Sequence, residues 1–320
     1  MRKETSSLWS PNEEIQKKSK LELFCKKLDK KNLLKYKKDF NYLWRWSVNK
    51  PEDFWSEVWD FTNIKGEKGD TILKKNKVFF KNSFFPNSKL NYAENLLPKK
   101  NEEIAVKFMS ESNIEKKITW KELYQNVCKF SYFLKKINLK EKERVAAYVP
   151  NTIETIISFL ATSKNGLIWS SCSPDFGAQG VIDRFLQIKP KVLITCDYYN
   201  YNGKKINILE KISKILKKIK SIKKVVIFPY KNNLKNKINF KYEDFNLILK
   251  KSKLDKTFKK FNFNHPIYIL YSSGTTGIPK CIVHGAGGSL IQHKKEHQLH
   301  CNINENDKVF YFTTCGWMMW

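Results

Sequence analysis

The chain has 320 residues, of which 41% are hydrophobic and 14% aromatic, and it carries 60 Lys and Arg against 31 Asp and Glu. This apolar share can fill a sizeable core, which excludes wholesale disorder, and the formal net charge of +29 marks a strongly basic protein. The best apolar stretch, residues 153–169, contains Glu154 and Lys164, so no run reaches the roughly 18 residues that a membrane-spanning helix needs.

The first part of the chain differs in composition from the rest. Residues 1–96 are rich in aromatic side chains set among turn residues such as Pro51 and Pro86, which predicts an irregular N-terminal cap. From about residue 102, short apolar runs alternate with helical periodicity, a pattern typical of βα units. The sequence therefore predicts an α/β fold, doubly wound around a mainly parallel sheet with crossover helices. The cap takes residues 1–96 and the larger domain residues 97–320.

The clearest predicted helix begins at Thr119. Glu122 stands three residues later, at the position that completes a capping box. Apolar residues then recur on one face of the helix at Leu123, Val127, Phe130, Leu134 and Ile137.

The next units repeat this alternation. After a strand over 145–149, a second helix is predicted to begin at Asn151, with Glu154 as its capping partner. Further elements follow in chain order: a buried run over 167–171, a helix over 181–188, a strand over 191–195, a helix over 208–222 and a strand over 225–228.

Two later segments allow different interpretations. Residues 208–222 place five Ile on one stripe with Lys elsewhere, which fits a membrane-surface or calmodulin-binding helix. A crossover helix that packs on the core and leaves its Lys face in water is the favoured interpretation. The Lys- and Asn-rich stretch over 230–262 is weakly patterned and predicts a loop.

The segment that points to chemistry is 267–280, with the sequence IYILYSSGTTGIPK. A predicted strand over 267–271 runs directly into a loop of Ser, Thr and Gly. Glycines let backbone N–H groups approach a ligand closely, hydroxyls add donors, and a lysine adds a point charge. The G-x-x-x-x-G-K-[ST] spacing of a Walker A loop is absent. A phosphate-binding loop is predicted from Ser272, Ser273, Gly274, Thr275, Thr276, Gly277 and Lys280, with an ordinary Ser/Gly turn as the alternative.

This loop resembles that of the adenylate-forming enzymes, the superfamily of acyl-CoA synthetases, luciferases and peptide-synthetase adenylation domains. Further segments between about residue 40 and residue 320 resemble the acetoacetyl-CoA synthetase branch: RWSV (45–48), FWSEVWDF (54–61), LNYAENLL (90–97), WSSCSPDFG (169–177), DRFLQIKPKVL (183–193) and FTTCGWMMW (312–320).

The resemblance implies a two-step ligase reaction. Acetoacetate would attack the α-phosphate of ATP to give an acyl-adenylate and pyrophosphate, and the thiol of coenzyme A would then displace AMP. Bringing a carboxylate within about 4 Å of one negative charge costs roughly 4 kcal/mol at an effective dielectric constant near 20. The predicted loop, with Mg²⁺, would offset this repulsion by holding the outer phosphates.

The resemblance also implies that complete family members continue beyond residue 320. Several parts of such a family member would then lie outside this chain. They are the segments that bind adenine, the acidic residues that bind ribose and Mg²⁺, and the small C-terminal domain with its catalytic Lys. No catalytic residue is therefore assigned. We expect the 320-residue chain alone to bind nucleotide weakly and to turn nothing over.

Three further features have competing interpretations. The resemblance places Trp317 in the region of the acyl pocket, while a core aromatic at a strand end is the alternative. His284 is expected to be a packed, hydrogen-bonded imidazole rather than a catalytic base. His293, Glu296 and His297 spell H-x-x-E-H, a pattern of one zinc-protease class. A solvated helix face is the favoured interpretation of that pattern, and no metal ligands are predicted.

The positive charge could indicate a nucleic-acid partner. Only four of the basic residues are Arg, however, and Arg is the side chain that nucleic-acid-binding proteins favour for contacts with phosphates and bases. A compositional bias that places Lys on the surface explains the charge better, and no nucleic-acid or membrane partner is expected. The seven scattered Cys indicate reduced thiols in a cytoplasmic setting. Two alternatives stay open: another short-acyl-CoA synthetase, for acetate or propionate, and a non-catalytic basic protein that binds nucleotides or nucleic acid.

Overall fold

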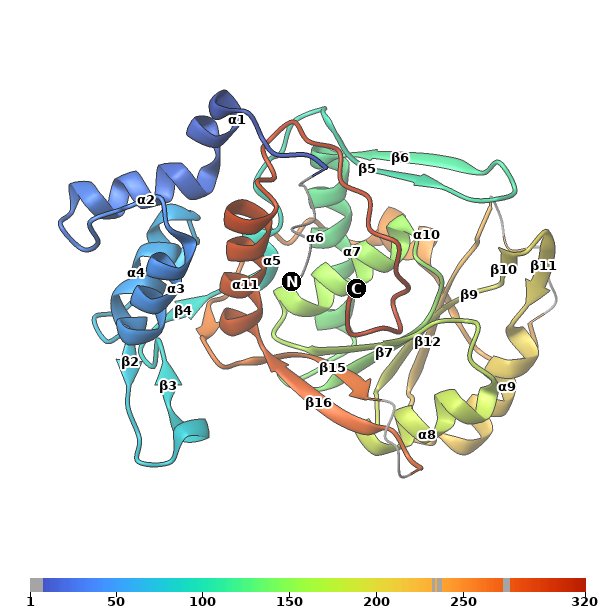
Figure 1. The fold of residues 1–320 in the computed structure, drawn as a ribbon. Coiled ribbons are helices and arrows are strands. Elements are labelled where there is room, and N and C mark those ends of the chain that lie inside the picture. Colours follow the sequence, from blue (N-terminus) through green and yellow to red (C-terminus); the bar gives the residue numbers. More distant parts are fainter. Residues whose placement is uncertain (1–7, 232–233, 235–237, 273–276) are drawn as a thin grey trace. The chain divides into compact units, whose positions relative to one another are not determined.

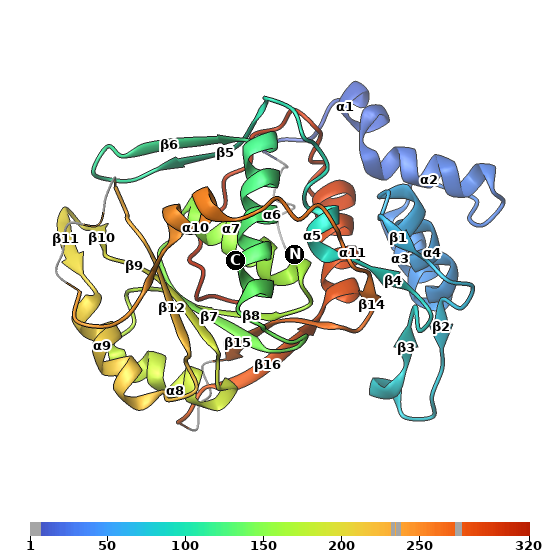
Figure 2. The ribbon, with the colours of Figure 1, turned by 180° about the vertical axis from the view of Figure 1, so that it is seen from behind.

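The computed structural model describes residues 8–231, 234, 238–272 and 277–320. The chain divides into two compact units. The first unit comprises residues 1–88 and 288–310, and the second comprises residues 89–287 and 311–320. Figures 1 and 2 show the elements of both units from opposite sides.

The first unit is mainly helical. Its elements are α1 (Glu13–Lys18), α2 (Lys20–Lys30), α3 (Phe40–Asn49), α4 (Pro51–Phe61), β1 (Gly66–Glu67), β2 (Leu73–Lys74), the 3-10 turn η1 (Phe79–Lys81), β3 (Ser83–Phe84), most of α11 (Ala286–Lys295) and the π-helical turn η2 (Glu296–His300). The stretch expected to be irregular, residues 1–96, therefore contains these first four helices and also α5 (Tyr92–Asn95), which belongs to the second unit. Local capping explains them, because Asn12, Ser19 and Asp39 each accept a backbone N–H at a helix start, and Pro51 opens α4.

Aromatic contacts hold the first unit together. Phe24 of α2 is fully buried, and its ring lies 5.2 Å from the ring of Phe61 in an edge-on arrangement. The same helix binds residues from the other end of the chain, since the backbone N–H of Lys20 donates to Asn302 Oδ1 at 2.9 Å and its ammonium donates to the carbonyl of Ile303 at 2.8 Å. Residues 288–310 thus complete the unit that the N-terminal helices begin.

The second unit is built on a seven-stranded sheet with the order β13-β12-β9-β7-β8-β15-β16. Every neighbouring pair is parallel except β15 and β16. The strands are β7 (Arg144–Tyr148), β8 (Ile168–Cys172), β9 (Val192–Cys196), β12 (Lys224–Phe228), β13 (Glu243–Asp244), β15 (Pro266–Ser272) and β16 (Lys280–Gly285).

Helices cover both faces of this sheet, so the doubly wound α/β prediction is confirmed (Figures 1 and 2). The helices α6 (Trp120–Lys136), α7 (Ile153–Lys164) and α10 (Phe245–Lys251) lie on one face, and α8 (Ala178–Ile188) and α9 (Leu209–Lys218) lie on the other. The smaller elements are α5 (Tyr92–Asn95), the hairpins β5 (Ile104–Met109) with β6 (Glu115–Thr119) and β10 (Tyr198–Tyr201) with β11 (Lys204–Asn207), and the pair β4 (Lys89–Leu90) with β14 (Phe261–Asn262).

The predicted capping box of α6 is present. Thr119 accepts the backbone N–H of Glu122, and the Glu122 carboxylate accepts the backbone N–H of Thr119. The start of α7 differs from the prediction by one residue, because Thr152 is its N-cap and accepts the N–H of Thr155. The Asn151 side chain instead accepts a hydrogen bond from the indole of Trp320 at 2.9 Å.

Two other expectations concern the Ile-rich helix over 208–222 and the loop over 230–262. Helix α9 is shorter than the predicted 208–222, and four of the five Ile of the stripe are buried while Ile222 is half-buried, so the crossover-helix interpretation is confirmed. The predicted loop over 230–262 contains α10, whose N-cap Asp244 accepts the N–H of Leu247 and which buries Phe245 and Ile248. The low apolar content of this stretch hid a helix that has only two core-facing residues. Every helix within the described ranges is too short or too polar to span a bilayer.

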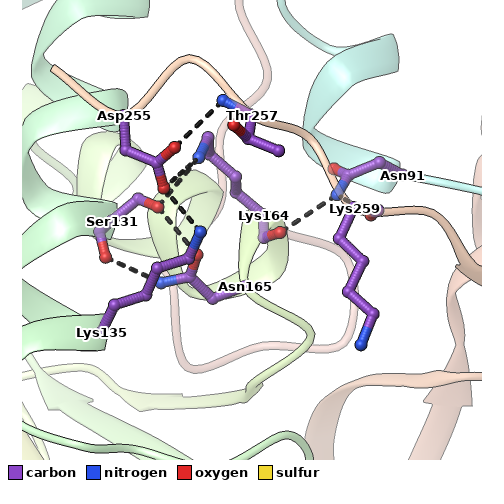
Figure 3. Close-up of polar contacts among 8 residues, drawn as sticks. All are labelled: Asn91, Ser131, Lys135, Lys164, Asn165, Asp255, Thr257 and Lys259. Carbon is purple, nitrogen blue, oxygen red and sulfur yellow. Dashed lines mark hydrogen bonds and ion pairs between the residues drawn. The ribbon is translucent and has the colours of Figure 1, made fainter.

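A buried polar cluster joins α6, α7 and the segment after α10 (Figure 3). The ammonium of Lys164 is inaccessible to solvent and lies 3.3 Å from Asp255 Oδ2 and 3.1 Å from Ser131 Oγ. Asp255 also pairs with Lys135 at 2.6 Å. Burial lowers the pKa of Lys164, and the Asp255 carboxylate opposes that shift. Since Lys164 is enclosed by its partners, we interpret this cluster as one that stabilises the packing of α6, α7 and the segment after α10.

Candidate functional site

The predicted phosphate loop connects the two antiparallel strands at the edge of the sheet. In the β15–β16 ladder, Ser272 lies opposite Lys280 and Tyr271 opposite Cys281. The strand β16, which the sequence did not predict, therefore fixes the distance between the two ends of the loop. Ser273, Gly274, Thr275 and Thr276 lie outside the described residues.

The loop leaves the carboxyl end of β15. In open α/β sheets, ligands bind beyond the carboxyl ends of the parallel strands, which is where this loop stands. Gly277 has a φ of +106°, a conformation that favours glycine. Lys280 is exposed, and no carboxylate in the described part of the chain forms an ion pair with it. The lysine that the sequence selected is thus available to an anionic ligand.

Helix α8 braces both ends of the loop. Before the loop, the Tyr271 hydroxyl lies 3.0 Å from Ser170 Oγ on the neighbouring strand. The guanidinium carbon of Arg184 lies over the Tyr271 ring, 5.7 Å from its centroid. Burial raises the pKa of Tyr271 well above its usual value, so the phenol stays protonated. After the loop, Gln187 Nε2 donates to the carbonyl of Pro279 at 2.9 Å. These contacts hold the two ends of the loop in fixed positions.

The last ten residues lie across the carboxyl ends of β7 and β8. Cys315 Sγ donates to the carbonyl of Val149 at 2.9 Å, and Ser171 Oγ donates to the carbonyl of Cys315. A side chain on Gly316 would meet the backbone N of Ser173 at 2.8 Å. The FTTCGWMMW and WSSCSPDFG segments are therefore packed together beside the strand that carries the loop.

Trp317 lies in this segment, within a turn closed by its own N–H donating to the carbonyl of Thr314 at 3.1 Å. Its side chain is 62% exposed, so the alternative of a core aromatic at a strand end is wrong. The hydroxyls of Thr313 and Thr314 are buried and have no hydrogen-bond partner among the described atoms. Buried hydroxyls without a partner are costly, and they leave polar groups at this edge of the sheet.

His284 lies on β16 and is packed, as expected. Its ring lies 4.9 Å from the ring of Tyr268, and burial lowers its pKa. The expected hydrogen bond is not found at Nε2, which is buried without a partner in the described part of the chain. A neutral imidazole against an aromatic ring is a packing residue rather than a base poised near a substrate.

The H-x-x-E-H residues lie at the end of α11 and in η2. The rings of His293 and His297 are nearly parallel, with centroids 6.4 Å apart. The Glu296 carboxylate already accepts from Gln292 at 2.8 Å and pairs with Lys295 at 2.9 Å. Among residues 8–231, 234, 238–272 and 277–320, no group of three His, Cys, Asp or Glu side chains could hold a metal ion.

The local sequence pattern predicts the loop but indicates no role for Tyr271, Arg184 and Gln187. The sequence does show that Arg184 and Gln187 share one face of a helix, because they stand three residues apart. Nothing in the local pattern indicated that this face would meet both ends of a loop some 90 residues later, since that contact depends on the order of strands in the sheet.

Comparison with known proteins places these features in context. A protein-family description, "AMP-binding enzyme", matches residues 95–320. The "Acetoacetyl-coenzyme A synthetase" of Rhizobium meliloti (strain 1021) is 41% identical over 316 residues, 98% of this chain and 48% of that protein. The "Acetoacetyl-CoA synthetase" of Gallus gallus is 43% identical over 88% of this chain and 44% of its own length.

Among solved structures, the fold is similar to "Acetoacetyl-CoA Synthetase from Streptomyces lividans", with a TM-score of 0.91 and 30% sequence identity. The superposition covers 99% of this chain and 49% of that protein. The chain therefore spans about half the length of the relatives that it matches.

Proposed function

Because this chain belongs to the AMP-binding enzyme family, we propose that it is part of an ATP-dependent ligase that joins acetoacetate to the thiol of coenzyme A. The reaction passes through an acyl-adenylate and releases AMP and pyrophosphate. The observation that carries the proposal is the β15–β16 hairpin, which holds Ser272 opposite an exposed Lys280 at the carboxyl end of β15. Acetoacetate is the proposed acid because the relatives described above are acetoacetyl-CoA synthetases.

In this proposal the loop residues 272–277 and Lys280 bind the outer phosphates of ATP. Attack of a carboxylate on the α-phosphate brings negative groups together, and pyrophosphate must leave with additional charge. Backbone N–H groups, hydroxyls and an ammonium stabilise such charge when they point at the place where it develops. The contacts of Arg184 and Gln187 keep both ends of the loop in position for this task.

The family resemblance also implies Mg²⁺ bound with ATP. The described residues offer no cluster of metal-ligating side chains, and Lys280, the charged side chain that follows the loop, is a cation. We therefore assign no residue of this chain to Mg²⁺, and we derive no step through it.

The proposal also covers the domain division, the acyl pocket and the location of the protein. Residues 1–96 are proposed as the cap and residues 97–320 as the first portion of the AMP-binding domain, although the compact units place residues 89–96 with the second unit and residues 288–310 with the first. The proposed boundary is close to the start of the family match at residue 95. Trp317 is proposed to line the acyl pocket, beside the apolar side chains of Met318 and Met319. The proposed location is the cytoplasm, and no nucleic-acid partner is proposed.

The test compares the 320-residue chain with a fusion in which the remaining half of the Rhizobium meliloti relative follows residue 320. We expect the chain alone to form no acetoacetyl-CoA from ATP, acetoacetate and coenzyme A, and the fusion to form it with release of AMP. Lys280→Ala in the fusion should reduce kcat/KM at least about a hundredfold, as removal of one charge-stabilising donor does. Lys214→Ala, which changes an exposed lysine of α9, is the matched control.

The same fusion distinguishes the alternatives. Equal or greater turnover with acetate or propionate would replace acetoacetate by another short acid. A non-catalytic nucleic-acid-binding protein would instead show tight filter binding with a steep dependence on salt and no thioester formation. Activity of the fusion that survives Lys280→Ala unchanged would contradict the role given to the loop.

A further inference from the structure

The hairpin formed by β2 and β3 presents two adjacent large apolar side chains at its tip. Phe79 is 87% exposed and Phe80 is 82% exposed, and both lie in the 3-10 turn η1. Phenylalanine is normally buried, and contiguous exposed apolar surface marks a place where a protein meets a partner or a membrane.

The tip is an ordered turn. The backbone N–H of Asn76 donates to Asn82 Oδ1 at 2.7 Å, and the N–H of Val78 donates to Asn76 Oδ1 at 2.9 Å. The N–H of Asn82 then closes the 3-10 turn on the carbonyl of Phe79 at 3.1 Å. The two phenylalanines are therefore held outward by a network of hydrogen bonds and lose little further freedom on binding.

The base of the hairpin is anchored in the first unit. The ring of Phe84 lies 6.4 Å from the ring of Trp55 on α4, and the backbone N–H of Phe85 donates to the carbonyl of Ile72 at 2.7 Å. Figure 1 shows β2 and β3 extending away from α3 and α4, the helices of the same unit.

The exposed tip continues into an apolar groove of the same unit. A cavity of about 600 Å³ is bounded by α3, α4, η2 and the hairpin, and both Phe79 and Phe80 line it. Trp44 and Val48 of α3 line the same groove and are themselves more than half exposed. The apolar surface thus extends well beyond two side chains.

The charge that the hairpin itself carries has one sign. Lys74, Lys75, Lys77 and Lys81 flank the phenylalanines in the sequence, and residues 71–93 contain no Asp or Glu. Lys75 pairs with Glu52 at 3.4 Å, while the structure as described gives the other three no carboxylate partner. A partner that complements this surface would therefore offer negative charge together with apolar groups.

We propose that the tip of the β2–β3 hairpin docks onto a lipid bilayer that contains anionic phospholipids. The phenylalanines enter the boundary between headgroups and acyl chains, and the lysines contact the lipid phosphates. A second copy of the chain would bring like charges together, which disfavours self-association through this face. Docking of this kind needs no spanning helix, so it replaces the expectation of no membrane partner without requiring a transmembrane segment.

The test is co-sedimentation of the 320-residue chain with vesicles of phosphatidylcholine alone or of phosphatidylcholine mixed with phosphatidylserine. Since the whole chain is basic, a variant that keeps the charge is decisive. Phe79→Ser with Phe80→Ser should weaken binding to the mixed vesicles at least about tenfold, because two apolar side chains no longer enter the bilayer. Its thermal unfolding should match the wild type, since both side chains are exposed.

A pair of charge variants separates the hairpin from the general positive field. Lys74→Gln, Lys77→Gln and Lys81→Gln together should weaken binding by about fivefold for each lysine. Lys214→Gln, Lys217→Gln and Lys218→Gln on the solvent face of α9 make the same change in net charge and should have a much smaller effect.

Four results would overturn the proposal: no binding of the wild type to the mixed vesicles, no loss of binding in the double Phe variant, equal losses in the two lysine triples, or a change of oligomeric state caused by the double Phe variant. The last result would assign the surface to another protein chain.

Discussion

The seven-stranded sheet and the β2–β3 hairpin use the same residue type in opposite ways. Phe228 of β12 is fully buried, with its ring 6.1 Å from the ring of Phe245 on α10, whereas Phe79 at the tip of the hairpin is almost fully exposed. Both positions are apolar in the sequence, but only Phe228 lies in an apolar run that predicts a strand, over 225–228. An aromatic residue therefore contributes to stability in one region and is available for recognition in the other.

Truncation of one phenylalanine in each region should give the largest contrast. Phe228→Ala removes a packed ring from the core and should lower the free energy of unfolding by about 3–5 kcal/mol. Phe79→Ala should change it by less than about 0.5 kcal/mol. Urea unfolding followed by circular dichroism measures both values, and similar losses for the two variants would show that the hairpin tip is packed in solution.

The buried polar cluster of the second unit should respond more weakly, but still clearly. Asp255→Asn leaves the ammonium of Lys164 buried without its counter-charge and should cost about 3 kcal/mol of stability. Glu141→Gln, which breaks an exposed pair with Lys259, is the control and should cost less than about 1 kcal/mol. Equal effects of the two substitutions would mean that the cluster is open to water.

The same carboxylate predicts an acid-dependent loss of stability. Burial alone would raise the pKa of Asp255, but hydrogen bonding to Lys135 and the charges of Lys135 and Lys164 lower it to about 2. A carboxyl with a lowered folded-state pKa stabilises the protein above its unfolded pKa of about 4, and that contribution disappears as the pH falls from about 4 to 2. Urea unfolding at several pH values should show a loss of about 2 kcal/mol over this window, and Asp255→Asn should abolish that part of the loss.

The smallest expected effect concerns the loop. Gln187→Ala removes the hydrogen bond to Pro279 without exposing the core and should leave the stability unchanged. In the fusion protein it should raise the KM for ATP by about fivefold, the loss of roughly one hydrogen bond, with a smaller change in kcat. Gln179→Ala, at another polar position on α8, is the control. An unchanged KM for ATP in Gln187→Ala would show that ATP binding by the loop does not depend on this hydrogen bond.

The βα units were readable from the sequence because each carries its own signals. The capping box at Thr119 and the buried run of β7 depend only on neighbours in the chain, and both are present as predicted. The strand β16 was missed because its residues are mostly exposed and do not alternate clearly. The helices of the first unit were missed because their aromatic content suggested irregular packing.

The candidate site was predictable to a lesser extent. Gly277 and Lys280 were selected from composition and spacing alone, and the structure places Lys280 at a sheet edge with its side chain exposed. The contacts of Arg184 and Gln187 required knowledge of which strand lies beside which. Strand order is a property of the whole sheet, so no local pattern in the sequence reports it.

The reversed direction of β16 has a consequence for how this loop can vary. In a parallel sheet the next strand is reached through a long crossover, which tolerates insertions, but here the two ends of the loop are ladder partners. Side chains alternate between the faces of a strand, so adding or removing one residue within β16 would turn the Lys280 ammonium to the opposite face. Substitutions can therefore change the chemistry of the loop while its ends keep their positions, whereas changes in strand length would move the Lys280 charge away from the phosphates that it is proposed to bind.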